Sequence, residues 1–296
     1  MKKKSGINVF QFGSARQELG GGGAQFLSVL QRMAQEMGCR NSKRPVIIFN
    51  SHHYRLIDVI RFSLQGHVVH LRVDGPMYFH GWKRLRDELK VTLASIISKK
   101  IIFQSLWSYR LMRLTTFNRE FEIIHNCADP EVFSLTNTEP SSRYGIVFSS
   151  NSDNINKGYH WIHKIEEDLK SNVMAFGRFS GIDRRVSRGE LARNLNNAKV
   201  YIAASRWECC SNALIEAIAC GVVPVVLRSG SHPELVSNPY LDLVFETQEE
   251  LNSIVRQVMS LSDERFIQIN SHLRERFDAH KIIMQYCKFL NVVCDD

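Results

Sequence analysis

Short apolar runs alternate with longer segments of helical periodicity along almost all of the 296 residues. In the first half, strands are expected at 7–13, 45–51, 67–75, 101–105 and 121–126, and helices at 20–38 and 82–100. Parallel strands need long crossover connections, and a helix between two strands supplies one. This alternation therefore predicts an α/β protein with a parallel, doubly wound sheet.

The alternation restarts after a polar, turn-rich stretch at 129–143. In the second half, strands are expected at 144–150, 172–179, 199–205, 222–230 and 243–246, and helices at 157–170, 212–221, 248–261, 263–276 and 279–292. Each half has an ordinary domain size. We therefore predict two Rossmann-like domains, residues 1–135 and 136–278, facing each other across a cleft. A C-terminal helix within 279–296 is expected to return to the first domain.

The net charge of +8 is spread unevenly along the chain. Residues 1–135 carry 20 Lys and Arg against 10 Asp and Glu. Such a basic half suits an anionic membrane, an anionic acceptor or nucleic acid. A nucleic-acid partner is not expected, because no recognition motif accompanies the charge. No apolar run approaches the roughly 20 residues of a membrane span, and no secretory signal is evident, so a cytoplasmic protein is expected.

Seven cysteines are scattered along the sequence, and no CxxC pair occurs. They are Cys39, Cys127, Cys209, Cys210, Cys220, Cys287 and Cys294. An odd number at irregular spacing predicts reduced thiols, with neither a disulfide framework nor a zinc site.

Two short motifs lie where strands give way to helices. The glycines of GGGGA (20–24) would let the backbone approach a phosphate or sugar, although the GxGxxG fingerprint does not fit and a flexible loop is the alternative. Lys157 and Gly158 follow an expected strand and open a helix. A lysine there could reach a diphosphate, or it could simply be solvated.

Two glutamates, Glu208 and Glu216, stand with seven residues between them in SRWECCSNALIEAIACG (205–221). The first lies in the turn between an expected strand and helix, and the second lies about one helical turn inside. The helix N-terminus attracts anions, and carboxylates accept hydrogen bonds from vicinal hydroxyls. The pair could hold a hexose and a ribose, with phosphates between them. Alternatively, Glu208 caps the helix and Glu216 lies on a solvated face.

The stretch 204–236 resembles the donor site of GT-B glycosyltransferases of family 4, which are retaining enzymes with a Glu-x7-Glu motif. EAIACGVVPVV (216–226) and HPELV (232–236) continue that pattern. Other matching stretches follow in the family's order: GGGGAQF, IIHNCADPEVF (123–133), SSNSDNINKG (149–158) and FGRF (176–179). The resemblance covers most of the chain. Two departures are ECCSN in place of E-G-F-P and the lack of an arginine shortly before Lys157.

The resemblance implies roles for individual residues. Glu216 would bind the ribose, Glu208 the transferred sugar and Lys157 the leaving diphosphate. The other donor-binding residues implied are Gly22, Gly23, Gly158, Arg178, Ser211, Asn212 and Ala213. A second phosphate-binding cation could be Arg178, Arg184 or Arg206, among which the sequence does not choose.

The resemblance also implies that the run HLRVDGP (70–76) lies on the acceptor side of the site. Asp74 ends the expected strand and is the preferred acceptor-side residue, as a base or as a group that orients a hydroxyl. Arg72 could pair with it or meet an anionic acceptor. The alternative is that Asp74 caps a turn.

The resemblance thus implies a metal-independent retaining glycosyltransferase. It would move a sugar from a nucleotide-sugar to a hydroxyl of a glycan or lipid-linked acceptor in bacterial surface polysaccharide synthesis, such as lipopolysaccharide or capsule. No cofactor or metal is expected, since no Asp-x-Asp pair occurs. The basic helix at 82–100 suits peripheral contact with an anionic membrane, unless its charges are simply solvated. A catalytically weak or inactive nucleotide-sugar- or glycan-binding protein of the same fold is the alternative.

Overall fold

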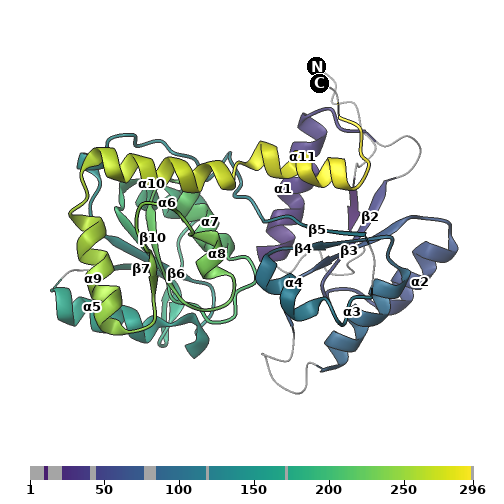
Figure 1. Cartoon of the computed structure of the whole chain (residues 1–296), viewed down its shortest axis with the longest axis horizontal. Coiled ribbons are helices and arrows are strands. Elements are labelled where there is room, and N and C mark those ends of the chain that lie inside the picture. Colours follow the sequence, from purple (N-terminus) through teal and green to yellow (C-terminus); the bar gives the residue numbers. More distant parts are fainter. Residues whose placement is uncertain are drawn as a thin grey trace. The chain divides into compact units, whose positions relative to one another are not determined.

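The computed structural model of the protein describes residues 10–12, 22–40, 45–76, 85–117, 120–170 and 173–294. The chain forms two compact units, residues 1–126 with 280–296 and residues 127–279 (Figure 1). Each unit contains a largely parallel sheet with helices between its strands. The expected α/β class with two Rossmann-like domains is therefore confirmed.

The first unit ends at Asn126, earlier than the boundary expected at 135. The residues just after Asn126 belong to the second unit because their side chains have partners there. Arg188 lies 3.6 Å from the Asp129 carboxylate and 5.2 Å above the ring of Phe133. Residues 280–296 return to the first unit, where Tyr286 contacts the ring of Phe26.

The sheet of the first unit has the strand order β1-β2-β3-β4-β5, and all its pairs are parallel. The strands are β1 (Phe10–Phe12), β2 (Val46–Asn50), β3 (Val69–Val73), β4 (Lys100–Phe103) and β5 (Glu120–Ile123). The helices are α1 (Gly22–Glu36), α2 (Leu56–Leu64), α3 (Leu85–Ile97), α4 (Leu106–Met112) and α11 (Ala279–Phe289). Neither α2 nor α4 was predicted from the sequence, because about two turns of helix carry little periodic signal.

The spacing of Leu85, Leu89, Leu93, Ile96 and Ile97 predicts one apolar face for α3, but of these residues only Ile97 packs against the core of the first unit. Val91 and Ala94 are buried in the core, whereas Leu89 is 58% exposed. The exposed apolar residues of α3 are Leu85, Leu89, Leu93 and Ile96, and those of the neighbouring α2 are Ile57, Ile60 and Leu64. The buried face of α3 is formed by the smaller Val91, Ala94 and Ser95, and the larger leucines face outward.

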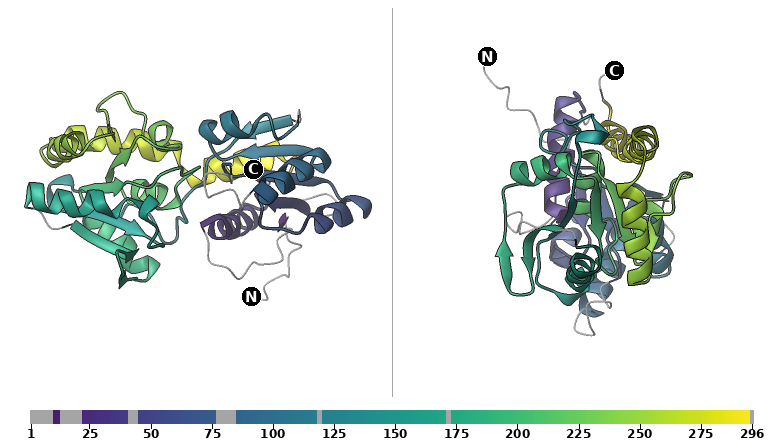
Figure 2. Two further views of the ribbon diagram at one scale, coloured as in Figure 1. Left: turned by 90° about the horizontal axis from the view of Figure 1, so that it is seen from below. Right: turned by 90° about the vertical axis from the view of Figure 1, so that its left-hand side faces the viewer.

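The sheet of the second unit has the strand order β11-β10-β9-β6-β7-β8. Its strands are β6 (Ile146–Ser150), β7 (Val173–Phe179), β8 (Ile182–Arg184), β9 (Val200–Ala203), β10 (Val223–Leu227) and β11 (Val244–Phe245). Its helices are α5 (Tyr159–Leu169), α6 (Arg188–Asn197), α7 (Asn212–Ala219), α8 (His232–Leu235), α9 (Gln248–Met259) and α10 (Asp263–Arg276). All pairs are parallel except β7 with β8, which form a hairpin at the sheet edge (Figure 2).

The strand order of this second sheet reverses at β6. The chain passes from β6 to β7 on one side and then reaches β9 on the other side of β6. In open parallel sheets, ligands bind outside the carboxyl ends of the strands at such a reversal. The segments that follow β6 and β9 are therefore where a site is expected.

A disulfide joins Cys39 to Cys294, and the prediction that all cysteines are reduced is wrong in this structure. The two residues lie 255 positions apart, so their spacing carried no signal. They meet because Arg40 and Val293 pair in an isolated antiparallel bridge. Separately, none of the helices in the described ranges is long and apolar enough to cross a membrane.

Candidate functional site

Lys157 and Glu208 meet at the point where the second sheet reverses. Lys157 ends a short 3-10 helix after β6, and Glu208 lies in the loop after β9. The Lys157 Nζ donates a hydrogen bond to the Glu208 Oε1 at 2.5 Å. Burial raises the pKa of Glu208, but the charge and hydrogen bond of Lys157 outweigh it, so that the pKa falls below its ordinary value. The structure thus holds an ionised carboxylate against an ammonium group, both partly open to solvent.

Glycine is required at position 158 for this pair to form. Gly158 has a φ of +77°, and a Cβ atom there would lie 2.3 Å from the carbonyl oxygen of Ala204. The start of α5 therefore approaches the end of β9 more closely than any side chain would allow. The backbone N–H of Arg206 donates to the carbonyl of Asn156 at 2.7 Å and joins the two loops directly.

The loop after β10 supports Glu208 from another direction. The Trp207 N–H donates to the Ser229 Oγ at 3.0 Å, and the Ser231 N–H donates to the Glu208 carbonyl at 2.8 Å. A Cβ atom on Gly230 would lie 2.3 Å from that carbonyl oxygen. The loops that follow β6, β9 and β10 are thus packed together, and this packing fixes the backbone of Glu208.

His232 is a buried neighbour of Glu208 whose side chain the sequence did not single out. Its Nδ1 lies 3.3 Å from the carbonyl oxygen of Leu227. Burial lowers the pKa of His232, and the negative charge of Glu208 opposes that shift only in part. The imidazole of His232 is therefore neutral at neutral pH.

Glu216 lies in α7 and faces a cation that the sequence did not reveal. The Arg188 Nη2 lies 3.7 Å from the Glu216 Oε1, and Arg188 also contacts Asp129. Burial raises the pKa of Glu216 to about 7, because it outweighs the stabilising effect of Arg188. Arg188 opens α6 directly after its capping residue Ser187. The sequence analysis predicted no helix over 188–197, and nothing in it placed Arg188 beside Glu216.

Tyr201 is a buried residue near both glutamates. Its hydroxyl lies 3.0 Å from the Ser149 Oγ, and burial raises its pKa. The charges of Glu216 and Glu208 raise that pKa further. Tyr201 therefore stays protonated, and it lies near enough to both carboxylates for their charges to act on it.

The N-terminus of α7 lies between these two glutamates in the sequence. Ser211 is the N-cap, and its Oγ accepts a hydrogen bond from the Leu214 N–H at 3.5 Å. Asn212 and Ala213 form the first turn, and both are half-buried. The hydroxyl of Ser211 is thus engaged in capping, and the amides of the first turn are the groups that suit an anion.

The three arginines considered as a second phosphate-binding cation lie at different places. Arg178 is half exposed on β7, 3.4 Å from the Asp183 carboxylate across the hairpin. Arg184 lies on β8 and is exposed. Arg206 is exposed on the same loop as Glu208. Of these three, Arg206 is the one whose loop is hydrogen-bonded directly to the residue before Lys157.

In the first unit, Arg72 is buried at the centre of a polar network. Its guanidinium donates to the Asn50 Oδ1 at 2.5 Å, to the Tyr286 hydroxyl at 3.1 Å and to the Asn126 Oδ1. It also lies 3.4 Å from the carboxylate of Asp74. The expected pairing with Asp74 is present. The side chain of Arg72 has no exposed surface, so in this structure it positions Asp74 and does not reach an acceptor.

Asp74 follows β3, and its side chain is 24% exposed. Its backbone carbonyl accepts a hydrogen bond from the hydroxyl of Ser108. Gly22 and Gly23 begin α1, and a Cβ atom on Gly23 would lie 2.9 Å from the Asn50 Nδ2. A small residue at position 23 is thus explained by the packing of Asn50, which Arg72 holds in place.

Comparisons with known proteins address the second unit most directly. Residues 183–279 match the family described as "Glycosyl transferases group 1". The matched stretch contains Arg188, Glu208 and Glu216. No curated protein sequence matches the chain.

Solved structures with a similar fold cover most of the chain. Anabaena HepE in complex with UDP and glucose is 14% identical, with a TM-score of 0.68 over 93% of this chain and 84% of that one. Sucrose-phosphate synthase from Thermosynechococcus elongatus is 14% identical, with a TM-score of 0.65 over 89% and 76%. The UDP-forming α,α-trehalose-phosphate synthase from Burkholderia xenovorans is 9% identical, with a TM-score of 0.62 over 90% and 78%.

At these identities the solved structures establish the fold, which is the GT-B fold of two Rossmann-like domains. The match of residues 183–279 adds the class of enzyme that the second unit resembles. Together they support the expectation of a glycosyltransferase.

Proposed function

We propose that this protein is a retaining glycosyltransferase of family 4 that acts in bacterial surface polysaccharide synthesis. It would move a hexosyl or related sugar from a nucleotide-sugar donor to a hydroxyl of a glycan or lipid-linked acceptor. The observation that carries the proposal is the Lys157–Glu208 pair, which lies outside the carboxyl ends of β6 and β9 where the sheet reverses. Glu216 lies on α7, which follows the loop that carries Glu208, and Arg188 lies on α6, which precedes β9.

The chemistry of these groups suits the breaking of a glycosyl–phosphate bond. In the transfer, the bond from the anomeric carbon to the diphosphate oxygen breaks, and negative charge builds on that oxygen. An ammonium group and helix amides fixed beforehand stabilise such charge without rearranging during the reaction. Lys157 and the first turn of α7 would supply them, and Glu208 would accept hydrogen bonds from the transferred sugar.

Glu216 would bind the ribose of the donor. A carboxylate can accept hydrogen bonds from both vicinal hydroxyls of a ribose at once. Arg188, 3.7 Å away, favours the ionised form that such binding needs. We propose Arg188 and Arg206 as the cations that replace the arginine missing from the segment before Lys157.

The acceptor side would use Asp74, as a base or as a group that orients the attacking hydroxyl. Arg72 places a buried positive charge 3.4 Å from that carboxylate and would hold it in position. We propose that the transfer needs no metal, with Lys157 and the α7 amides in the role that a metal plays in other transferases. Retention of configuration is carried over from the family resemblance.

Donor binding and turnover test this proposal separately. Calorimetry with UDP, GDP, dTDP and ADP should identify one preferred nucleotide, and Glu216→Ala should weaken its binding by more than tenfold. Glu249→Ala, which removes an exposed glutamate of α9, is the matched control and should bind as the parent does. If Glu216→Ala binds the nucleotide as tightly as the parent, the assignment of the donor site is wrong.

A second assay distinguishes an enzyme from a binding protein of the same fold. With the matching nucleotide-sugar, the parent should release nucleoside diphosphate by transfer or slow hydrolysis, in the presence of a chelator. Lys157→Ala should lose most of this turnover, because the leaving diphosphate is no longer neutralised. Tight donor binding without any turnover across a panel of sugar acceptors would favour the inactive binding protein instead.

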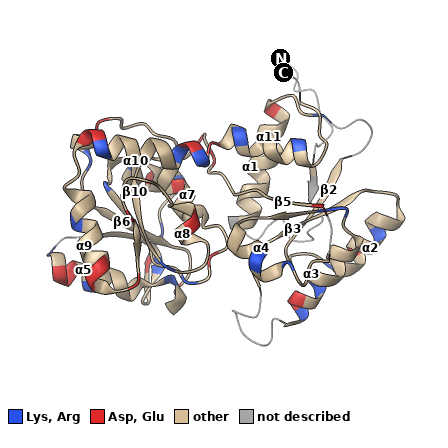
Figure 3. Cartoon of the chain, viewed as in Figure 1, with Lys and Arg blue, Asp and Glu red and all other residues tan. Residues whose placement is uncertain are grey.

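We also propose a cytoplasmic location with peripheral contact at the inner face of the membrane, through α2 and α3. Of the basic residues expected to serve this purpose, Lys83 and Arg84 lie outside the described residues. Lys100 is buried and bonded to the carbonyl of Phe289. The start of α3 carries charges of both signs (Figure 3). The stronger observation is therefore the row of exposed leucines and isoleucines on α2 and α3, beside the exposed Arg61, Arg86 and Lys99.

Vesicle flotation tests this contact. The parent should float with vesicles that contain phosphatidylglycerol and not with pure phosphatidylcholine vesicles. Leu89→Asp should lose flotation, since it places a charge in the middle of the apolar face of α3. Leu114→Asp changes a leucine that is 87% exposed beyond α4 and should float as the parent does. No flotation with anionic vesicles would remove the membrane proposal and leave the donor site unaffected.

A further inference from the structure

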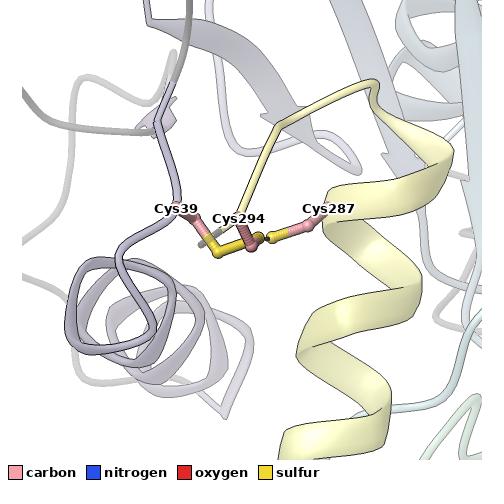
Figure 4. Close-up of a disulfide and its surroundings, with 3 residues drawn as sticks. All are labelled: Cys39, Cys287 and Cys294. Carbon is pink, nitrogen blue, oxygen red and sulfur yellow. Dashed lines mark hydrogen bonds between the residues drawn. A yellow bond between two sulfur atoms is a disulfide. The ribbon is translucent and has the colours of Figure 1, made fainter. Parts of the chain in front are cut away.

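Three cysteines from distant parts of the sequence gather in the first unit (Figure 4). Cys39 follows α1, Cys287 lies in α11 and Cys294 lies near the end of the chain. Their sulfur atoms all lie within 4.8 Å of one another. Within the described ranges, this is the one group of three or more Cys, His, Asp or Glu side chains with the geometry to hold a metal ion.

The third sulfur makes the cluster more than a disulfide. Cys39 and Cys294 are bonded, and the Cys287 Sγ lies 3.6 Å from the Cys39 Sγ as a free thiol. Two thiolates bound to one tetrahedral Zn²⁺, each about 2.3 Å from the metal, are about 3.8 Å apart. The separation of these two sulfur atoms is therefore close to that of neighbouring ligands on a single ion.

Backbone hydrogen bonds hold the three residues in place independently of the disulfide. The Arg40 N–H donates to the Val293 carbonyl at 2.6 Å, and the Val293 N–H donates back at 3.2 Å. The Val292 N–H also donates to the Cys287 carbonyl at 2.8 Å. When the disulfide is reduced, the backbone therefore keeps all three thiols adjacent.

We propose that Cys39, Cys287 and Cys294 form a redox-dependent site that binds one thiophilic cation such as Zn²⁺ in its reduced form. A dithiol or phosphine reductant supplies two electrons to the Cys39–Cys294 bond, becomes oxidised itself and leaves two thiols. The cation then replaces the protons of the thiols and is bound by three thiolates, which leaves a fourth position for water or another ligand. A sulfur atom bonded to another sulfur is not a thiolate, so the disulfide and the bound cation exclude each other.

This site is separate from the proposed transfer reaction. Its three ligands lie in the first unit, whereas Lys157, Glu208 and Glu216 lie in the second. The cation would clamp the end of the chain to α1 and α11 under reducing conditions, as the disulfide does under oxidising ones. The sequence analysis predicted no zinc site because the ligands come from three segments without any recognisable spacing.

The test uses the full chain reduced with a phosphine, freed of reductant under anaerobic conditions and titrated with Co²⁺. Thiolate ligands give Co²⁺ an intense charge-transfer band in the near ultraviolet, and Zn²⁺ should abolish that band by displacement. Metal analysis after gel filtration counts the bound Zn²⁺. Cys287→Ser is the diagnostic variant because it keeps the Cys39–Cys294 disulfide and removes one ligand. Cys127→Ser, which replaces a buried thiol of the second unit, is the matched control.

We expect one Zn²⁺ per chain in the reduced parent and in reduced Cys127→Ser, at least tenfold weaker binding in reduced Cys287→Ser, and no binding in the oxidised parent. The proposal is overturned if the reduced parent gives no charge-transfer band. It is also overturned if the oxidised and the reduced parent bind Zn²⁺ equally. This comparison uses the parent alone, so it stays decisive even if Cys287→Ser does not fold. Unchanged binding in a folded Cys287→Ser would likewise exclude this cluster.

Discussion

The affinity for a nucleotide-sugar should rise with pH in the neutral range because of Glu216. The pKa of this carboxyl lies at about 7, since burial raises it and Arg188 opposes the shift only in part. Only the ionised carboxylate can accept hydrogen bonds from both ribose hydroxyls, because the protonated acid must use one oxygen as a donor. Only the molecules in which Glu216 is ionised are therefore competent to bind the donor in this way.

The size of the effect follows from that pKa. At pH 6 about one-tenth of the molecules carry an ionised Glu216, and at pH 8 about nine-tenths do. The apparent dissociation constant is the intrinsic one divided by the competent fraction. Affinity should thus increase about tenfold between pH 6 and pH 8 and level off above pH 8.

Calorimetry with an intact nucleotide-sugar, such as UDP-glucose, measures this dependence. The diphosphate diester of the donor does not titrate in this range, so the pH dependence reports on the protein. Glu216→Gln should bind more weakly at pH 8 and show a flat profile, because its amide does not titrate. A Gln variant that keeps the full tenfold rise would refute the reasoning and assign the pH dependence to another group, such as His160 or His232.

Three further changes should have measurable effects on the free energy of unfolding. The pKa of Glu216 in the folded protein lies above its ordinary value of 4.5, so the folded state loses stability as pH rises through 7. Glu216→Gln should therefore be more stable than the parent by up to about 3 kcal/mol at pH 8 and equal to it below pH 4. Gly158 has a φ of +77°, and a Cβ atom there would clash at 2.3 Å, so Gly158→Ala should destabilise the folded protein by at least about 2 kcal/mol and weaken donor binding. Gly181 has a similar φ of +74° but no atom within 4 Å of an added Cβ, so Gly181→Ala is the control that shows the backbone strain alone. Arg72→Met should cost about 3–5 kcal/mol in urea unfolding, since it removes the buried guanidinium that donates to Asn50, Asn126 and Tyr286, and Arg61→Met on the exposed surface is its control. A loss below about 1 kcal/mol for Arg72→Met would show that the network does not hold the first unit together.

Much of the fold could be predicted because strands and helices each produce a characteristic local periodicity of apolar residues. The strands predicted at 45–51 and 199–205 became Val46–Asn50 and Val200–Ala203. Periodicity did not show which face of a helix packs against the sheet. The apolar residues of α3 suggested the face that packs on a core, yet Leu89 is exposed and Ala94 is buried. Which face of a helix is buried depends on the strands beneath it, and these are far away in sequence.

In the candidate site, too, some residues could be proposed from the sequence and others emerged only from the packing of the helices. Lys157, Glu208 and Glu216 were proposed from the sequence, because they lie around strand-to-helix junctions in stretches that resemble a known donor site, and their roles stay predictions. Arg188 was missed, since only the packing of α6 beside α7 brings it to Glu216. The role expected for Arg72 changed as well, because its burial among Asn50, Asn126 and Tyr286 makes it a positioning residue.

The sequence by itself determined the alternation of strands and helices, the restart that makes two domains, and the glutamates and lysine that suit a sugar diphosphate. These depend on neighbours a few residues apart, where local backbone geometry decides. The tertiary structure alone decided which charges meet, which ionise and which cysteines pair. Cys39, Cys287 and Cys294 lie within 4.8 Å although up to 255 residues separate them. Such contacts, like the raised pKa of Glu216, arise from packing between segments that no local pattern connects.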